Sequence, residues 1–148
     1  MELQFSIKNF NELSVYELYR YLQLRSEVFV VEQNCVYQDL DNKDQLAQHV
    51  LIHKQQQLIA CARILPPQTA YEQISIGRVI IAASARKTGL GHALMEYCLA
   101  QILQQFGEQE IVLSAQAHLQ NFYKKHNFAP QGEIYLEDGI PHIQMIRK

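Results

Sequence analysis

The chain has 148 residues, 48% of them hydrophobic and 19% charged, and its formal net charge at pH 7 is −2. This length fits one domain over residues 1–148, which buries about two thirds of the surface of its unfolded chain. The balanced charge argues against nucleic acid as a partner, and no apolar run reaches the roughly 20 residues of a membrane-spanning helix, so no membrane partner is expected.

The chain begins with a predicted strand and a predicted helix. Residues 3–8 alternate between apolar and polar side chains with the period of a half-buried strand. Ser14 and Glu17 have the spacing of a capping box, in which each side chain bonds the backbone N–H of the other residue. The apolar residues that follow recur at helical spacing, which predicts a helix from about Val15 into the high twenties.

A loop and a hairpin are predicted next. The polar and acidic run at 32–44 is rich in turn-forming residues, which indicates a loop. Two apolar runs follow at 49–54 and 58–65, separated by a glutamine-rich turn. Pro66 and Pro67 end the second run, because proline does not continue a strand ladder and disfavours a helix before it. The two runs therefore predict an antiparallel hairpin.

The middle of the chain predicts a strand that leads into the clearest helical pattern of the sequence. Residues 73–81 are rich in β-branched side chains, as strands are. From Leu90 to Phe106 apolar residues recur at three- and four-residue steps. Gly107 follows, at the position where helices commonly end in a left-handed residue.

The last part of the chain predicts a short buried strand at 110–114, a helix at about 117–126 that ends at Asn127, and a β-hairpin around Asp138-Gly139. An Asp-Gly pair between alternating runs is the strongest short hairpin signal. The complete order is β-α-loop-β-β-β-α-β-α-β-β. It predicts a mixed α/β (α+β) fold with one mainly antiparallel sheet and helices on both of its faces.

Three cysteines, Cys35, Cys61 and Cys98, are odd in number and widely spaced. That pattern favours reduced, packed thiols over a disulfide framework or a Cys-x-x-Cys metal site, and no metal is expected. A nucleophilic role for Cys35 lacks a recognisable histidine partner. The first residues carry neither the basic nor the apolar region of a secretory signal, so a cytoplasmic location is expected.

The stretch Gly77–Gly91 joins the predicted strand at 73–81 to the predicted helix through a glycine-containing turn. At the start of a helix four backbone N–H groups lack partners and the helix dipole is positive, so Thr88–Ala93 could bind a diphosphate. Gly89 and Gly91 would keep side chains away from that site.

Arg86 and Lys87 add positive charge beside this turn, suited to phosphate oxygens. A Gly-x-Gly before a helix is a weak signal by itself, and neither the phosphate-loop motif nor the Rossmann motif is present. The wider context is more specific: Ile76–Ile81, Arg86–Gly91 and Phe122–Phe128 together strongly resemble the GNAT superfamily of acyl-CoA-dependent N-acyltransferases.

Further segments narrow the resemblance to the ElaA group of that superfamily. They are Arg25–Gln33, Asp39–Asp41, His49, Ala62–Leu65 and Glu137–His142, so the resemblance covers essentially the whole chain. It implies a single N-acetyltransferase (GNAT-like) domain over residues 1–148. The implied activity is transfer of an acetyl group from acetyl-CoA to a primary amine of a small-molecule or peptide acceptor, by direct attack on the thioester.

The resemblance also implies a set of residues that bind acetyl-CoA. Backbone groups of residues 79–81 would hydrogen-bond the pantetheine arm as an added strand does. Gln116 stands where many members of the superfamily have asparagine. The residues implied for the CoA site are Val79, Ile80, Ile81, Arg86, Lys87, Thr88, Gly89, Leu90, Gly91, His92 and Gln116.

Tyr123 occupies the family position of the general acid. A phenol with a reference pKa of about 10 is protonated at neutral pH and can donate to the leaving thiolate. A backbone N–H near Val79 or Ile80 is the candidate donor to the oxyanion. The amine must lose a proton before it attacks, and the sequence leaves several bases open. The candidates are Glu32, His49, Glu137 and His142.

Other interpretations stay open at this point. Asp39, Asp41 and Asp44 form either an acidic rim that attracts a cationic amine or a solvated face of the loop. The alternative to an enzyme is a non-catalytic acyl-CoA-binding module or sensor, and a third hypothesis is a small structural or interaction domain. A homodimer through exposed sheet edges is the assembly that this class suggests.

Overall fold

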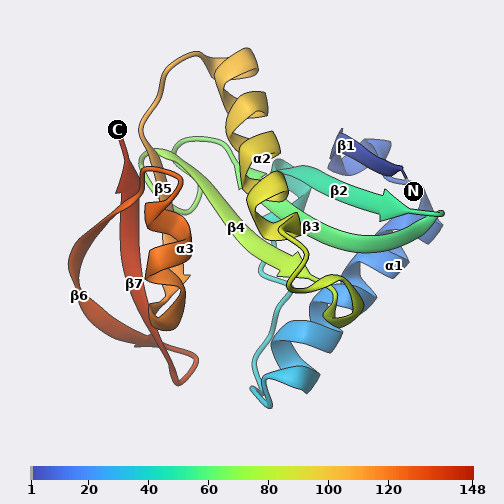
Figure 1. Ribbon diagram of the computed structural model, residues 1–148, viewed down its shortest axis with the longest axis horizontal. Helices are drawn as coiled ribbons and strands as arrows, with labels where there is room; N and C mark the ends of the chain where they lie inside the picture. Colours follow the sequence, from blue (N-terminus) through green and yellow to red (C-terminus); the bar gives the residue numbers. More distant parts are fainter. Residues whose placement is uncertain (1) are drawn as a thin grey trace.

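Residues 2–148 are described by the computed structural model, and seven strands of this part of the chain form one sheet in the order β1-β2-β3-β4-β5-β7-β6 (Figure 1). Neighbouring strands are antiparallel except β4 and β5, which run parallel. The predicted mixed, mainly antiparallel sheet is confirmed. The strands are β1 Leu3–Asn9, β2 Gln48–Lys54, β3 Gln57–Leu65, β4 Ile74–Ile81, β5 Ile111–Gln116, β6 Ala129–Glu137 and β7 Ile140–Arg147.

The α-helices are α1 Val15–Arg25, α2 Leu90–Phe106 and α3 Gln120–Lys124, and α1 continues into π-helical turns, η2, over Ser26–Glu32. Four short 3-10 segments of the described chain connect other elements. They are η1 Phe10–Glu12, η3 Asp44–Leu46, η4 Ala83–Ala85 and η5 Ala117–Leu119. Within residues 2–148, every helix is too short or too polar to cross a membrane.

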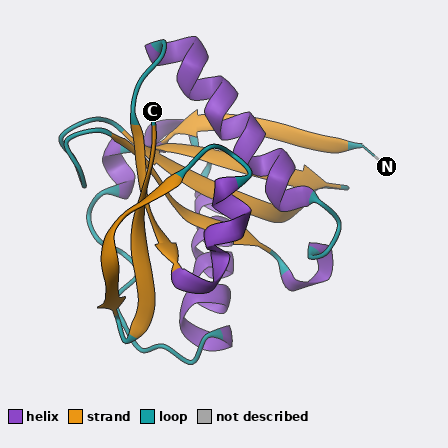
Figure 2. Ribbon diagram, turned by 60° about the vertical axis from the view of Figure 1, so that its left-hand side comes forward, coloured by secondary structure: helices purple, strands orange, loops and turns teal. Residues whose placement is uncertain are grey.

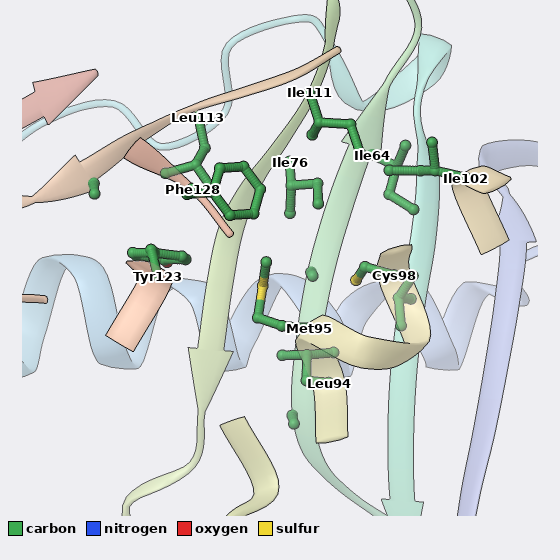
Figure 3. Packing of buried hydrophobic residues seen from close by; sticks show 14 of the residues in the cluster. Ile64, Ile76, Leu94, Met95, Cys98, Ile102, Ile111, Leu113, Tyr123 and Phe128 are labelled. Atoms are coloured by element: carbon green, nitrogen blue, oxygen red, sulfur yellow. The ribbon is translucent and has the colours of Figure 1, made fainter. Parts of the chain in front are cut away.

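Helices cover both faces of the sheet, as predicted (Figure 2). On one face, α2 and α3 pack onto the strands, and the labelled side chains of Figure 3 form the centre of that core. On the other face, Tyr21 and Leu24 of α1 pack onto β2 and β3. Successive residues of a strand point to opposite faces. Ala60 of β3 accordingly belongs to the first core and Cys61 to the second.

α1 begins with the predicted capping box. Ser14 Oγ accepts a hydrogen bond from the Glu17 N–H at 3.0 Å, and Glu17 Oε1 accepts one from the Ser14 N–H at 2.9 Å. Regular α-helical bonding ends at Arg25, and η2 carries the chain on to Glu32. The helical segment therefore runs past its predicted end in the high twenties, and it changes type on the way. Such π-helical turns are rare and occur frequently at functional sites.

Both predicted hairpins form, and both turn through left-handed residues. Gln55 and Gln56 have φ values of 52° and 64°, and Asp138 and Gly139 have 52° and 79°. Two successive positive φ values give the turn whose twist matches that of the flanking strands. Asn127, at the predicted end of the α3 region, also has a positive φ of 69°.

β4 and β5 separate soon after they meet. Within residues 2–148 they pair at Ile74–Ile111 and Ser75–Val112 and nowhere further on, although β4 continues to Ile81 and β5 to Gln116. Figure 1 shows the two strands diverging from that point. Beyond Ser75, the edge of β4 that faces β5 has no strand partner in the described chain. Such an edge can bond an added extended chain.

β4 also contains a bulge beside this opening. The register between β3 and β4 shifts between Cys61 and Arg63, and two residues of β4, Arg78 and Val79, have no partner on β3. Arg78 has a φ of 49°, which is uncommon for a residue other than glycine. Bulges redirect side chains and are frequent next to active sites. The Arg78 side chain accordingly reaches the loop at residues 39–41.

Candidate active site

A cavity of about 430 Å³, which we call the central cavity, lies where β4 and β5 separate. Its walls come from the β4 bulge, β5, α3, the β6–β7 turn and the loop after η2. Small-molecule sites in proteins commonly measure about 300–1,000 Å³. Five of the predicted site residues, from distant parts of the sequence, lie together in this wall: Val79, Gln116, Tyr123, Glu137 and His142.

A second cavity of about 230 Å³, the helix-start cavity, lies at the N-terminus of α2. Gly89, which precedes α2, has a φ of 81°, and a Cβ on Gly91 would lie 3.2 Å from Cε1 of Phe122. The backbone conformation thus favours glycine at 89, and the Phe122 ring favours it at 91. Most of the residues predicted for the diphosphate line this one cavity, and Ile81, predicted for the pantetheine arm, lines it too. The diphosphate residues in its wall are Arg86, Lys87, Gly89, Leu90, Gly91 and His92.

The other residues predicted for the CoA site have different surroundings. The Val79 side chain lines the central cavity. The side chain of Ile80 is buried against α1, so only its backbone can face the opening. Thr88 is exposed, and its hydroxyl donates to the Ala85 carbonyl at 2.7 Å. The structure therefore brings Val79 to the same cavity as Tyr123 but does not bring Thr88 into either cavity wall.

Arg86 is paired with Glu32 beside the helix-start cavity. Its Nη1 and Nη2 donate to Glu32 Oε1 and Oε2 at 2.7 and 2.6 Å, and its Nε donates to the Ile81 carbonyl at 3.0 Å. The hydrogen bonds from Arg86 hold the pKa of Glu32 below its usual value. The two side chains are 40% and 39% exposed, and exposed pairs of this kind contribute about 0–1 kcal/mol. Glu32 therefore serves as the charge partner of Arg86 and lies outside the central cavity.

Tyr123 of α3 lines the central cavity with a side chain that is otherwise buried. Its ring packs edge-on against Phe122 at 5.0 Å and against Phe128 at 6.1 Å, and Figure 3 shows it at the margin of the core below Phe128. Burial raises the pKa of Tyr123 to about 12. The hydroxyl therefore keeps its proton at neutral pH, and no group of residues 2–148 hydrogen-bonds it.

His142 and Glu137 face each other in the central cavity from the two strands of the last hairpin. His142 Nε2 lies 3.6 Å from Glu137 Oε2, and Glu137 Oε1 accepts a hydrogen bond from Ser114 Oγ at 3.1 Å. His142 Nδ1 lies 2.7 Å from the Ile140 carbonyl oxygen. A carbonyl oxygen can only accept, so Nδ1 is the donor. In the neutral ring Nε2 then has a free lone pair in the cavity.

His49 lies outside both cavities. Its buried side chain has Nδ1 at 2.9 Å from the Tyr21 hydroxyl and Nε2 at 2.8 Å from the Asp44 carbonyl oxygen. Because the carbonyl accepts, Nε2 donates to it and Nδ1 accepts from Tyr21. Burial lowers the pKa of His49. Both ring nitrogens are thus used within the fold, and the structure does not bring His49 to the other candidate bases.

The three aspartates of the loop are paired with three arginines. Arg25 contacts Asp39 and Asp44 at 2.9 and 2.8 Å, Arg63 contacts Asp41 and Asp44 at 2.8 and 3.0 Å, and Arg78 contacts Asp39 at 2.7 Å. Burial by itself raises the pKa of Asp41, but hydrogen bonds from Arg63 lower it overall. The predicted acidic rim and the predicted solvated face are therefore both wrong. We call this group the arginine–aspartate cluster: Arg25, Arg63, Arg78, Asp39, Asp41 and Asp44.

The arginine–aspartate cluster holds the loop after η2 against the sheet and so places Tyr37 and Lys43 in the wall of the central cavity. Removing one partner of a buried ion pair costs about 3–5 kcal/mol, because the other charge is left unpaired. The sequence reasoning missed this pairing. The sequence does contain a signal for the pairing: Arg63 lies within an apolar strand and Arg25 within a helical stripe. Arginines in such positions are buried, and a buried charge requires a partner of opposite charge.

The three cysteines are free and buried, which confirms the prediction of reduced thiols. Cys61 and Cys98 lie within the cores on the two faces of the sheet. Cys35 differs because it lines the central cavity, and its Sγ donates to the Asp138 carbonyl at 3.2 Å.

Comparison with known proteins identifies relatives along nearly the whole chain. The family described as acetyltransferase (GNAT) domain matches residues 12–148. Protein ElaA of Escherichia coli (strain K12) is 47% identical over 140 residues, which cover 93% of this chain and 92% of that protein.

Two solved structures share the complete fold. A crystal structure of an acyl-CoA N-acyltransferase from Pseudomonas aeruginosa has a TM-score of 0.94 at 44% identity. The crystal structure of Escherichia coli ElaA has a TM-score of 0.93, also at 44% identity. Each comparison covers 99% of this chain and 100% of the other. The similarity extends over the whole domain, it supports an acyl-CoA-dependent N-acyltransferase activity, and it places this chain in the GNAT acetyltransferase family, within its ElaA-like group.

Proposed function

We propose that this protein is an N-acetyltransferase that transfers an acetyl group from acetyl-CoA to a primary amine of a small acceptor. Membership of the GNAT family supports an acyl-CoA as the donor. One observation supports catalysis above all: Tyr123, a proton donor, and His142, a proton acceptor, line one cavity at the opening between β4 and β5.

The residues at this opening fit an acyl-CoA. The unpaired edge of β4 offers backbone groups of residues 79–81 to the pantetheine arm. The helix-start cavity offers the free N–H groups of the first turn of α2, together with Lys87, to the diphosphate. Gly89 and Gly91 leave room for it. Bound acyl-CoA supplies a thioester carbonyl that an amine can attack.

His142 is the base in this proposal. An alkyl ammonium is not nucleophilic, and His142 Nε2, with its free lone pair, accepts the proton that the acceptor must lose. The nearby Glu137 carboxylate stabilises the positive charge that the imidazole then gains. Glu32 and His49 are left out of the mechanism, because their side chains are bonded to groups outside the central cavity.

Tyr123 is the acid, and its hydroxyl donates a proton to the sulfur as the CoA thiolate leaves. The raised pKa of about 12 keeps this proton in place until it is needed. The Val79 N–H, in the bulge without a β3 partner, is the candidate donor to the negative charge that develops on the carbonyl oxygen. One proton is thus taken up by His142 and one is released by Tyr123 for each C–N bond formed and C–S bond broken.

Two measurements test the proposal together. Calorimetric titration with acetyl-CoA should show binding, and a panel of polyamines, amino acids and peptides should include acceptors that gain the mass of one acetyl group. Propionyl-CoA and butyryl-CoA in the same panel test the preference for acetyl. Binding without transfer to any acceptor would favour the non-catalytic acyl-CoA-binding module, whereas folded protein that binds no acyl-CoA would reject both functions.

A further inference from the structure

Three cationic side chains of the central cavity have no part in the proposed chemistry, and one of them, Arg63, is already engaged by Asp41 and Asp44 through Nη1 and Nη2. Lys43, from the loop after η2, and Arg78, from the β4 bulge, both line the cavity. The Lys43 ammonium has no hydrogen bond or ion pair with any group of residues 2–148. A lysine kept in a cavity wall without a partner is available to an anionic ligand group.

Arg78 is held so that one nitrogen of its guanidinium is left for a ligand. Its Nε lies 2.7 Å from Asp39 Oδ1, and its Nη2 donates to the Asp39 carbonyl at 2.8 Å and to Asp41 Oδ2 at 3.4 Å. Within the described chain Nη1 has no partner, and the side chain is 19% exposed. These contacts and the left-handed backbone fix the guanidinium before any ligand binds, which reduces the entropy lost on binding.

The charges of the central cavity are divided between two sides. Within the arginine–aspartate cluster three positive charges face three negative ones, so Lys43 is a cation that the cluster does not neutralise. The β6–β7 turn adds Glu137, whose carboxylate lies 3.6 Å from His142 Nε2, and Asp138, which also lines the cavity. The Asp138 carboxylate has no partner in residues 2–148. The cavity therefore presents cations from the loop and the bulge, beside Asp41, which is paired with Arg63, and carboxylates with a base from the hairpin.

We infer that the acceptor is an amine that also carries a carboxylate, so that it matches both sides of the cavity. Lys43 and Arg78 Nη1 bind the carboxylate, since planar guanidinium and ammonium groups form the stronger, charge-assisted hydrogen bonds with carboxylates. Glu137 and Asp138 attract the ammonium end and direct it to His142. The inference rests on the proposed N-acetyltransferase function, and it disfavours polyamines, whose second cation would meet Lys43.

Matched acceptors test this inference during turnover. Leucine is compared with leucinamide and 3-methylbutylamine, and 5-aminopentanoate with pentylamine, with the acetylated products measured by mass spectrometry. We expect kcat/KM to be at least about tenfold higher for the better of the two carboxylated compounds than for its counterparts that lack the carboxylate. Lys43→Met should reduce that ratio, whereas Lys54→Met, an exposed lysine at the end of β2, should keep it.

The outcomes separate this inference from the proposed function. Equal or better transfer to the amines without a carboxylate overturns the inference and leaves the acetyltransferase function in place. The same conclusion follows if Lys43→Met lowers kcat/KM equally for acceptors with and without a carboxylate. Absence of transfer to every acceptor of the wider panel counts against the acetyltransferase itself.

A second measurement needs no turnover. Pentanoate, a carboxylate without an amine, should give saturation-transfer NMR signals with the wild-type protein and with Lys54→Met, and weaker signals with Lys43→Met. Equal signals from all three proteins would overturn the carboxylate site whatever the acceptor panel shows.

Discussion

His142 donates from Nδ1 to the carbonyl oxygen of Ile140 at 2.7 Å, and this hydrogen bond leaves Nε2 as the free nitrogen beside Glu137. The donor and the acceptor are two residues apart, at the start of β7, directly after the Asp138-Gly139 turn. The backbone of a tight hairpin therefore sets the tautomer and the orientation of the ring. In the proposed mechanism, this fixed orientation makes His142 ready to accept a proton before the acceptor binds.

Replacing His142 with glutamine should lower kcat/KM about 100-fold or more, because the amide of glutamine does not accept a proton at neutral pH. The affinity for acetyl-CoA should change little, since the base does not contact the CoA arm in the proposed mechanism. Steady-state kinetics and calorimetric titration measure the two effects. His53→Gln, on β2 and outside both cavities, is the matched control. If His142→Gln turns over at the wild-type rate, His142 is not the base, and Glu137 is the remaining candidate in the cavity.

Tyr123→Phe should lower kcat by about 100-fold while leaving the dissociation constant of acetyl-CoA nearly unchanged, which is the pattern of a group that acts in the transition state. The thermal midpoint should also change little, because the Tyr123 hydroxyl has no hydrogen-bond partner among residues 2–148 to lose. Tyr97→Phe on α2 controls for the loss of a phenol elsewhere. Unchanged turnover in Tyr123→Phe would remove this residue from the mechanism.

Gly89→Ala and Gly89→Glu form a matched pair at the start of α2. Both replacements place a side chain on a backbone with φ of 81°, at a cost of about 1–2 kcal/mol in stability. Only glutamate adds a negative charge to the predicted diphosphate site. We therefore expect similar thermal midpoints but weaker acetyl-CoA binding in Gly89→Glu, by about tenfold relative to Gly89→Ala. Equal affinities would mean that the diphosphate binds elsewhere.

Glu32→Gln should tighten the binding of acetyl-CoA. The Glu32 carboxylate occupies the Arg86 guanidinium with two hydrogen bonds, and a neutral amide competes less well with phosphate oxygens for the same arginine. Since an exposed pair contributes about 0–1 kcal/mol, the gain should be at most about fivefold. Calorimetry at low salt measures it, with Glu27→Gln of η2 as the control. Weaker binding of acetyl-CoA would instead mean that the cofactor binds the conformation in which Glu32 and Arg86 are paired.

The buried His49 should make the fold sensitive to acid. Burial lowers its pKa in the folded protein, whereas the unfolded chain has a value of about 6.5. As the pH falls below about 6.5, the unfolded chain takes up a proton that the folded protein does not. The free energy of unfolding then decreases by up to about 1.4 kcal/mol per pH unit, until the folded pKa is reached.

Urea unfolding at a series of pH values from about 7.5 to 5.5 measures this slope. His49→Gln should give a shallower slope, because the titrating group is gone. An unchanged slope would assign the acid sensitivity to His53 or His126, whose pKa values burial also lowers.

Signals that operate between neighbours in the sequence predicted most of the fold. The capping box of Ser14 and Glu17, the apolar period of α2 and the Asp138-Gly139 turn each depend on residues within one element or one turn. The exceptions are changes of helix type. The helix expected at 117–126 is a 3-10 turn followed by the five residues of α3, and α1 passes into π-helical turns. The packing of these short segments overrides their weak local preferences.

The sequence by itself also located the contiguous part of the candidate site. The strand-to-helix segment from Gly77 to Gly91 has a recognisable motif, and its residues line the two cavities at the opening of β4. Only the tertiary structure determined which charged side chains form ion pairs with each other. Arg86 pairs with Glu32 and Arg78 with Asp39, across 54 and 39 residues of sequence. The energy of an ion pair depends on distance and burial. Neither quantity can be read from spacing along the chain, so the paired loop, the unused His49 and the free Nε2 of His142 became visible only in the folded protein.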